Sequence, residues 1–209
     1  MIRDIQNNYK LNHVGRLRYD SSNSVTEPIT LSEAKAHLRV EDTNDDTYIT
    51  TLISVARSAC ENYLGYMLAR NSAVNFYLDQ FPHSSVIVLH GVWQPGTVAI
   101  SYYDTDDSGA IWSAANYSVD QESQPARIFL NDSSNYPNTS ENIPSGINID
   151  MTNAGPADVD EIPKAIYQGI LLVIGRYYEN RQDVVTGTQV HEVPKMVGHL
   201  LNPYRVVGI

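Results

Sequence analysis

The spacing of apolar residues predicts two helices in the first third of the chain. Apolar side chains recur at helical intervals after Thr30-Leu-Ser-Glu33, which is a capping box, so we predict a helix over residues 30–39. A longer apolar stripe covers residues 46–64 and is followed by Gly65, a residue type that ends helices in the left-handed conformation. The pattern therefore predicts two amphipathic helices separated by an acidic turn.

The middle of the chain follows a different pattern, with short alternating or β-branched segments separated by proline and glycine. Such segments are typical of strands joined by antiparallel connections. Residues 132–145 consist of turn-forming residue types, which predicts an excursion from the body of the domain. The predicted strands cover residues 73–78, 86–89, 97–103, 127–130 and 147–151.

A third long helix is predicted to begin at Pro163, because proline is well tolerated at a first helical position. Its apolar residues cover a broad face, so we expect it at the centre of the core. Gly169 and Gly175 each disfavour the helix by about 1 kcal/mol relative to alanine. We therefore expect a neighbouring helix to approach closely at these glycines. A short helix is predicted over residues 194–201, with Pro203 after it.

Together these elements predict an α+β fold, with a mainly helical core of three to four helices. A β-rich insert is expected between the second and third long helices. Residues 1–29 are polar and lack sustained periodicity, so they are either a floppy terminus or an arm that orders on a neighbouring molecule. The predicted organisation is a single domain over residues 30–205, with helices in 30–65, the insert in 72–155, helices in 162–201, and a tail over 202–209.

Charge is low in amount and uneven in placement. The chain has 14 Lys and Arg against 24 Asp and Glu, a net charge of −10, which disfavours binding to phosphate backbones by charge. Residues 104–161 carry eleven acidic residues and a single basic residue, Arg127. This segment is either a solvated loop surface or a surface that repels a polyanion or steers a basic partner.

The candidate chemistry is sparse. Cys60 is the only cysteine, which excludes an internal disulfide and a cysteine-based zinc site, and its apolar neighbours predict an inert buried thiol. Residues 104–109 resemble the start of a calcium loop, but Ala115 stands where a bidentate Glu belongs, so a β-turn is the better interpretation. No histidine pair has helical zinc spacing, and no nucleophile, phosphate or dinucleotide motif occurs. We expect no enzyme activity, cofactor or metal.

Two further expectations concern location and contacts. No apolar run approaches the roughly 18 residues of a membrane span, and no secretory signal opens the chain, which indicates a cytosolic protein or a component assembled there. The 14 tyrosines are many for this length, and tyrosine favours protein interfaces. For those in the insert, Tyr102, Tyr103, Tyr117 and Tyr136, a contact role is at least as well supported as a core role.

Several motifs resemble the head–tail connector (adaptor, head-completion) proteins of tailed phages. The first is Ile29-Thr-Leu-Ser-Glu-Ala-Lys-Ala-His-Leu-Arg-Val40, followed by Asp45-Asp46 and Glu61-Asn-Tyr-Leu-Gly65. The resemblance covers about residues 28–205, and its motifs occur in the family's order. The later motifs are Asp79-Gln-Phe-Pro82, Ile100-Ser-Tyr-Tyr-Asp104, Asn153-Ala-Gly155, Ile162-Pro-Lys-Ala-Ile166, Tyr178-Glu-Asn-Arg181 and the closing Leu200-Leu-Asn-Pro-Tyr-Arg205.

The resemblance implies a structural protein of the virion neck that is assembled in the host cytoplasm. Identical subunits would form a twelve-fold ring that docks on the portal protein, continues the DNA channel and provides a platform for a tail or neck (stopper, tail-completion) protein. DNA would pass without specific binding, and no enzyme activity, cofactor or membrane contact is implied. Two alternatives remain: a soluble partner-binding protein without a ring, and an enzyme that uses the acidic insert.

Two sets of candidate site residues follow from this interpretation. The short amphipathic C-terminal segment is expected to dock on the portal, with packing on its own domain as the alternative. Its candidate residues are Val193, Lys195, Met196, Leu200, Leu201, Tyr204, Arg205 and Val206. Acidic residues of the insert are expected to face the channel or the tail: Asp104, Asp106, Asp107, Asp120, Glu122, Asp132 and Glu141.

Overall fold

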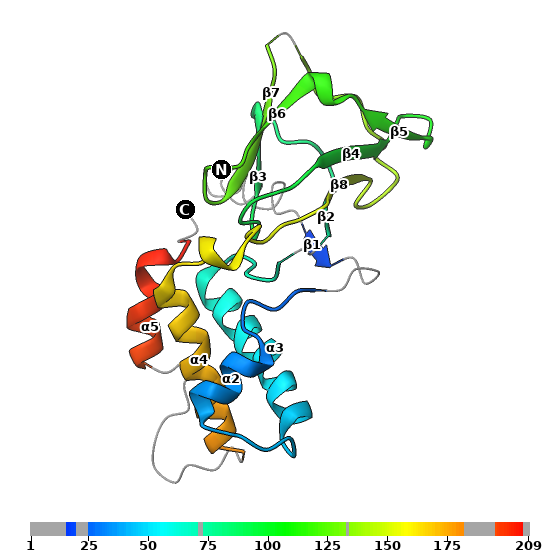
Figure 1. Ribbon diagram of the computed structural model, residues 1–209. Coiled ribbons are helices and arrows are strands. Elements are labelled where there is room, and N and C mark those ends of the chain that lie inside the picture. Colours follow the sequence, from blue (N-terminus) through cyan, green and yellow to red (C-terminus); the bar gives the residue numbers. More distant parts are fainter. Residues whose placement is uncertain (1–15, 20–24, 71–72, 133, 182–194, 207–209) are drawn as a thin grey trace, which may run out of the picture. The chain divides into compact units, whose positions relative to one another are not determined.

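A computed structural model describes residues 16–19, 25–70, 73–132, 134–181 and 195–206 (Figure 1). The chain divides into two compact units, which are described separately. The helical unit comprises Val25–Arg70 and Asp158–Ile209, and the sheet unit comprises Met1–Ser24 and Asn71–Ala157. Residues Asn71–Ala157 of the sheet unit are therefore inserted in sequence between the two halves of the helical unit, and Met1–Ser24 precede both halves.

The described residues of the helical unit form four α-helices, which lie side by side (Figure 1). They are α2 (Leu31–Leu38), α3 (Asp46–Leu64), α4 (Lys164–Glu179) and α5 (Lys195–Leu201), with short 3-10 turns η2 (Val159–Glu161) and η3 (Asn202–Tyr204). The predicted capping box is confirmed, because the Thr30 hydroxyl accepts from the Glu33 amide and the Glu33 carboxylate accepts from the Thr30 amide. Gly65 ends α3 with φ of 86°, as expected for a left-handed cap.

Helix α4 lies against all three other helices, and most of its apolar residues are buried. Close approach is confirmed at Gly169, where a Cβ would lie 3.1 Å from Leu201 Cδ2 of α5. At Gly175 a Cβ would meet His37 Nε2 of α2 at 3.5 Å, which is an ordinary contact distance. Cys60 on α3 is fully buried, and burial raises the pKa of its thiol to about 12. The predicted burial of the thiol is thus confirmed, and the raised pKa favours the protonated form over the reactive thiolate.

In the part of the sheet unit that the structure describes, the strands form two antiparallel sheets. The larger has the order β1-β2-β8-β4-β5, and the smaller has the order β3-β7-β6. The larger sheet consists of β1 (Arg16–Tyr19), β2 (Val74–Leu78), β8 (Ile147–Met151), β4 (Val98–Tyr103) and β5 (Gly109–Trp112). The smaller sheet consists of β3 (Val86–Leu89), β7 (Ala126–Leu130) and β6 (Tyr117–Asp120), and the 3-10 turn η1 (Ala114–Asn116) precedes β6.

The register gives the larger sheet one buried face and one outer face. Phe76, Ile149, Ile100 and Trp112 are cross-strand neighbours, and all four are buried. Side chains alternate between faces along a strand, so the adjacent cross-strand row lies on the outer face. This outer row consists of Tyr77, Asn148, Ser101 and Ile111.

Aromatic rings hold the excursion over residues 132–145 against the sheet unit. Tyr136 stacks on Phe81 with ring centroids 4.7 Å apart, and Trp112 lies 5.2 Å from Tyr117 and 5.5 Å from Tyr136. Tyr117 donates a hydrogen bond to the Val98 carbonyl at 3.0 Å. Tyr117 and Tyr136 therefore pack inside the unit, whereas Tyr103 remains 43% exposed.

The predicted α+β class is confirmed, and the calcium-like segment is a turn. Asp104 Oδ1 accepts from the amides of Asp106 and Ser108, both at 2.9 Å, and thereby closes the connection between β4 and β5. Strands β1, β5 and β6 were not among the predicted strands. The sheet unit therefore contains more regular structure than the residue pattern indicated.

Candidate interaction surfaces

Three of the seven candidate acidic residues hold turns of the sheet unit. Asp104 closes the β4–β5 turn, and in the same turn Asp107, at φ of 59°, accepts from the Ser140 hydroxyl and the Asn142 side-chain amide. Asp120 organises the β6–β7 turn. Hydrogen bonds from Ser123 and then Arg127 lower the pKa of its carboxyl to about 2. These carboxylates have a structural role within their own turns.

The other four acidic candidates, Asp106, Glu122, Asp132 and Glu141, are all exposed. No hydrogen bond or ion pair is recorded for their carboxylates within the part of the chain that the structure describes. The contact between Asp107 and Ser140 brings Glu141 to the β4–β5 turn with Asp106, whereas Glu122 lies in the β6–β7 turn. The exposed acidic residues therefore lie on different loops and do not form one cluster.

The C-terminal segment is partly core and partly surface. Leu201 is fully buried against Gly169 of α4, so its side chain packs within the helical unit. Met196 is 62% exposed and Tyr204 is 37% exposed. Val193 lies outside the described residues, Lys195 begins α5, and Leu200 is half-buried.

The end of the described chain is fastened to the end of α3. The Val206 amide donates to the Leu64 carbonyl at 2.8 Å, and the Arg205 guanidinium lies 5.3 Å from the centre of the Tyr63 ring. Tyr63 donates to the Gly198 carbonyl of α5 at 3.3 Å. These contacts hold the segment in place and leave Met196 and Tyr204 as its exposed apolar side chains.

A polar cluster that the sequence did not predict joins the start of α3 to the end of α4. Asp45 Oδ2 accepts from the Tyr178 hydroxyl at 2.6 Å and from the Arg181 guanidinium at 2.9 Å. The Arg181 guanidinium also lies over the rings of Tyr48 and Tyr178, at 4.7 and 5.2 Å from their centres. The pKa of the Asp45 carboxyl is lowered, mainly by the hydrogen bond that it accepts from Tyr178. The cluster fixes the C-terminal end of α4.

A second unpredicted network surrounds Arg57, whose side chain is 10% exposed. Its guanidinium pairs with Glu27 Oε2 and Glu61 Oε2, both at 2.7 Å. The other oxygen of Glu61 accepts from the amides of Leu68 and Ala69 at 2.7 and 3.0 Å. The network therefore ties the segment before α2 and the segment after α3 to the middle of α3.

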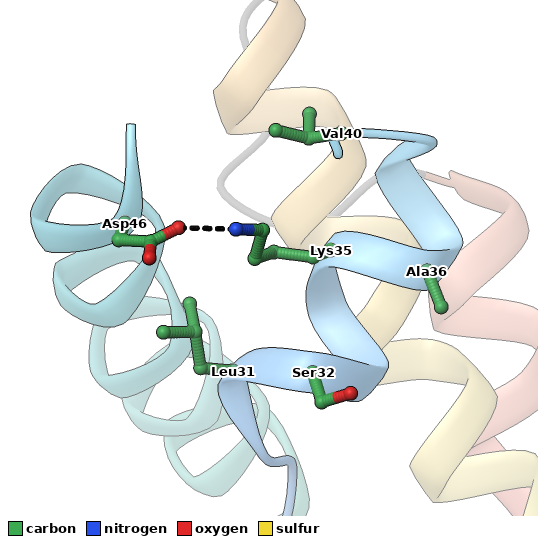
Figure 2. A pocket seen from close by; sticks show the side chains of 6 residues that line it. All are labelled: Leu31, Ser32, Lys35, Ala36, Val40 and Asp46. Atoms are coloured by element: carbon green, nitrogen blue, oxygen red, sulfur yellow. Dashed lines mark hydrogen bonds and ion pairs between the residues drawn. The ribbon is translucent and has the colours of Figure 1, made fainter. Parts of the chain in front are cut away.

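An open groove of about 550 Å³ lies beside α2 and the start of α3 (Figure 2). Leu31, Ala36 and Val40 contribute apolar lining, and Lys35 Nζ pairs with Asp46 Oδ1 at 2.6 Å. Because the cation and the carboxylate neutralise each other, the groove does not present a free charge to an ionic ligand.

A second hollow, of about 590 Å³, lies on the outer face of the larger sheet. Tyr77 and Asn148 come from the outer row, and Tyr103, Ile111 and Ile143 also line the hollow. The buried Oδ1 of Asn148 has no hydrogen-bond partner among the described residues. Ile111 is 82% exposed, the highest exposure recorded for a large apolar residue of the described chain.

In the described ranges, no three His, Cys, Asp or Glu side chains are grouped as a metal ion would need. None of the helices described above has the length and apolar character required to cross a membrane.

The geometry defines a class of α+β proteins in which a helical unit is interrupted in sequence by antiparallel β sheets whose turns are held by carboxylates. Within this class, residues 28–112 match the family described as Phage gp6-like head-tail connector protein. The match confirms the resemblance to head–tail connectors predicted from the sequence motifs. No curated protein matches the sequence closely.

Solved structures share the fold over nearly the whole chain. A chain from the neck of an empty gene transfer agent (GTA) particle, computed with C6 symmetry, aligns with a TM-score of 0.75 at 19% identity and covers 93% of this chain and 97% of that chain. A chain from the virion of a native GTA particle aligns at 0.66 and 20% identity, covering 92% and 96%. A chain from the native GTA neck, computed with C12 symmetry, aligns at 0.61 and 19% identity, covering 90% and 97%.

Proposed function

We propose that this protein is a structural head–tail connector of a tailed phage or a related particle and resides in the virion neck. Identical subunits form a ring that docks on the portal protein, extends the DNA channel and provides the attachment platform for the tail. A twelve-fold ring is the expected stoichiometry. The role is structural and non-catalytic, and DNA passes through without specific binding.

The observation that carries this proposal is the fold match with a neck component over 93% of the chain, at a TM-score of 0.75. The family match adds support from the sequence over residues 28–112, which contain α2, α3 and the strands β2 to β5. The titles of two matched structures name sixfold and twelvefold symmetry, which is consistent with a ring of identical subunits.

For the portal contact, we favour the exposed part of the C-terminal segment. Met196 and Tyr204 present apolar surface on α5 and η3, whereas Leu201 holds the same segment to α4. Exposed large apolar side chains on a well-anchored element are typical of protein interfaces. Val193, Lys195, Arg205 and Val206 belong to the same C-terminal segment.

For the channel or tail side, we favour the exposed acidic residues of the sheet unit. Asp106, Glu122, Asp132 and Glu141 are available for this role, because the carboxylates of Asp104, Asp107 and Asp120 bind within their turns. A negative lining lowers affinity for DNA at every phosphate, which allows the duplex to slide.

The experiment is to mix the purified protein with portal protein and image the particles. A closed ring on the portal is expected, and a protein that remains monomeric with portal present would contradict the proposal. A partner complex without a ring would point to a simple binding protein. Turnover of a substrate would point to an enzyme.

A variant pair tests the portal contact. Met196→Asp combined with Tyr204→Ala should abolish portal binding and leave the chain folded, because both side chains are exposed. Val55→Asp is the control, since Val55 is an exposed apolar residue of α3 with 45% exposure. Deletion of the residues after Leu201 should likewise remove binding. Unchanged binding by the double variant would refute this assignment.

A further inference from the structure

The outer edge of β5 is an unprotected edge of the larger sheet. No described strand pairs with β5 on the side away from β4. Natural edge strands are usually protected by charged residues, proline or bulges, but Gly109-Ala-Ile-Trp112 contains neither charge nor proline. An edge of this kind is available for pairing with another segment of chain.

Apolar surface and a hollow lie directly beside this edge. Ile111 of β5 is 82% exposed, and Tyr103 of β4 is 43% exposed. Both line the 590 Å³ hollow on the outer face, together with Tyr77 and Ile143. Asn148 lines the same hollow, and its buried Oδ1 lacks a donor among the residues that the structure describes. A ligand with apolar side chains and amide donors would complement this surface.

Charge restricts the occupant of the hollow. Asn71–Ala157, the main part of the sheet unit, contains nine acidic residues and one basic residue. The same face of a second copy would therefore be repelled. Residues 1–15 have the opposite character, because they contain Arg3 and Lys10 against Asp4. They also provide Ile5, Tyr9 and Leu11 as apolar side chains, and several Asn and Gln side chains as donors.

The position of β1 sets the point at which residues 1–15 join the sheet. Arg16 is the first residue of β1, which pairs with β2 at the edge of the sheet opposite to β5. Fifteen residues can extend to about 50 Å, and a five-stranded sheet is only about 19 Å wide. The sheet thus has two different edges: β1, which follows residues 1–15 in sequence, and β5, which lies beside the hollow. A ring of identical subunits needs two different faces on each subunit.

We infer that residues 1–15 of one subunit dock along the β5 edge of the next subunit, with their apolar side chains in the hollow beside Ile111. This inference rests on the proposed ring. Backbone pairing along β5 supplies affinity, and the contrast between the basic segment and the acidic sheet unit sets the direction of the contact.

Cysteine cross-linking in assembled rings tests this contact. One preparation carries Ile111→Cys, and a second carries a cysteine at Ile5, Tyr9 or Leu11. The two preparations are mixed on portal and oxidised. The native Cys60 does not interfere, because its thiol is fully buried. We expect a disulfide-linked dimer for at least one of the three positions, and none when His90→Cys, an exposed residue after β3, replaces Ile111→Cys.

Other results would overturn the inference. A disulfide that forms only within a doubly substituted chain would show that the segment folds back on its own sheet. Rings that form on portal without any cross-link would exclude the contact and leave the proposed function intact. If no ring forms with the unmodified protein, the proposed function fails and the inference falls with it.

Ring stability gives an independent measurement. Deletion of residues 1–15, or Ile111→Lys, should raise the protein concentration needed for half-assembly by about tenfold or more, as expected for loss of a buried apolar anchor. His90→Lys adds the same charge at an exposed site and should leave that concentration unchanged. An equal effect of Ile111→Lys and His90→Lys would contradict a specific contact at β5.

Discussion

At the residue scale, the helical unit depends on the charge of Arg57. Its guanidinium neutralises Glu61, whose side chain is only 11% exposed and whose second oxygen binds the Leu68 and Ala69 amides. Removal of one partner from a buried pair leaves an uncompensated charge, which is more costly than the loss of a surface pair. Arg57 is therefore a structural residue of the fold.

We predict that Arg57→Met lowers the free energy of unfolding by about 3 kcal/mol. Urea unfolding of the full chain, followed by circular dichroism, measures this change. The control is Lys164→Met, because the ion pair of Lys164 with Asp160 is exposed and should contribute less than about 0.5 kcal/mol. Equal losses of unfolding free energy in the two variants would show that burial does not increase the contribution of the Arg57 ion pairs to stability.

Asp120 should give the sheet unit a component of acid sensitivity. Its folded-state pKa of about 2 lies below the unfolded value, about 3.9, so the ionised carboxylate stabilises the fold above about pH 4. This stabilisation is lost as the pH falls through about 2. Thermal unfolding between pH 5 and about 2 should therefore show a smaller loss of melting temperature for Asp120→Asn than for the unmodified protein. Glu122→Gln, at an exposed residue of the same turn, should follow the unmodified protein.

At the scale of elements, the contact between α4 and α5 requires Gly169. A leucine there would clash with Leu201 Cδ2, which lies 3.1 Å from the Cβ position, and would displace α5. We predict that Gly169→Leu lowers the free energy of unfolding by roughly 1–3 kcal/mol, as overpacking does. Portal binding should fall with it, because α5 carries Met196. Urea unfolding and portal pull-down measure the two effects.

Gly175→Ala is the matched control for this contact. Its Cβ would meet the exposed His37 side chain at 3.5 Å, which is an ordinary contact distance. Alanine favours helix over glycine by up to about 1 kcal/mol, so the variant should be as stable as the unmodified protein or more stable. A similar loss of stability in Gly175→Ala and Gly169→Leu would contradict a specific requirement at α5.

Elements marked by local signals were predictable from the sequence. The Thr30 capping box and Gly65 define the ends of α2 and α3 through contacts within a few residues, and both were located correctly. Strands β3 and β8 also have the predicted bounds, because β3 is a short run of mostly β-branched apolar residues and β8 alternates apolar and polar residues. A local pattern is sufficient where the stabilising contacts are themselves local.

Features that depend on distant partners were not predictable. Strand β1 is Arg-Leu-Arg-Tyr, which shows weak strand character and forms by pairing with β2, some 60 residues later. The cluster of Asp45 with Tyr178 and Arg181 joins residues more than 130 positions apart. The sequence motifs contained these residues, but only the fold brings them together. For the same reason, the sequence could not separate turn-bound Asp107 from exposed Asp106.

At the scale of the whole molecule, net charge should control contact with DNA. Asp106, Glu122, Asp132 and Glu141 are exposed, so their neutralisation should not disturb the turns that Asp104 and Asp120 hold. We predict that the fourfold amide variant binds duplex DNA more tightly at low salt than the unmodified protein, and that the difference shrinks as salt increases. Fluorescence anisotropy with labelled duplex measures both trends.

The control for the charge prediction is a variant of equal charge with substitutions in the helical unit. Glu41, Asp42, Asp160 and Glu179 are exposed there and provide four matched positions. If those substitutions raise DNA affinity as much, total charge rather than the sheet unit controls the contact. No change in either variant would contradict an electrostatic role for the acidic residues.

The division of the helical unit between two distant parts of the sequence constrains synthesis of the chain. About 100 residues separate the end of α3 at Leu64 from the start of α4 at Lys164. At roughly 5–20 residues per second, a ribosome needs on the order of 5–20 s to cover that interval. During this time the nascent α3 has no α4 to cover its apolar face, so productive maturation depends on shielding that face until translation nears its end.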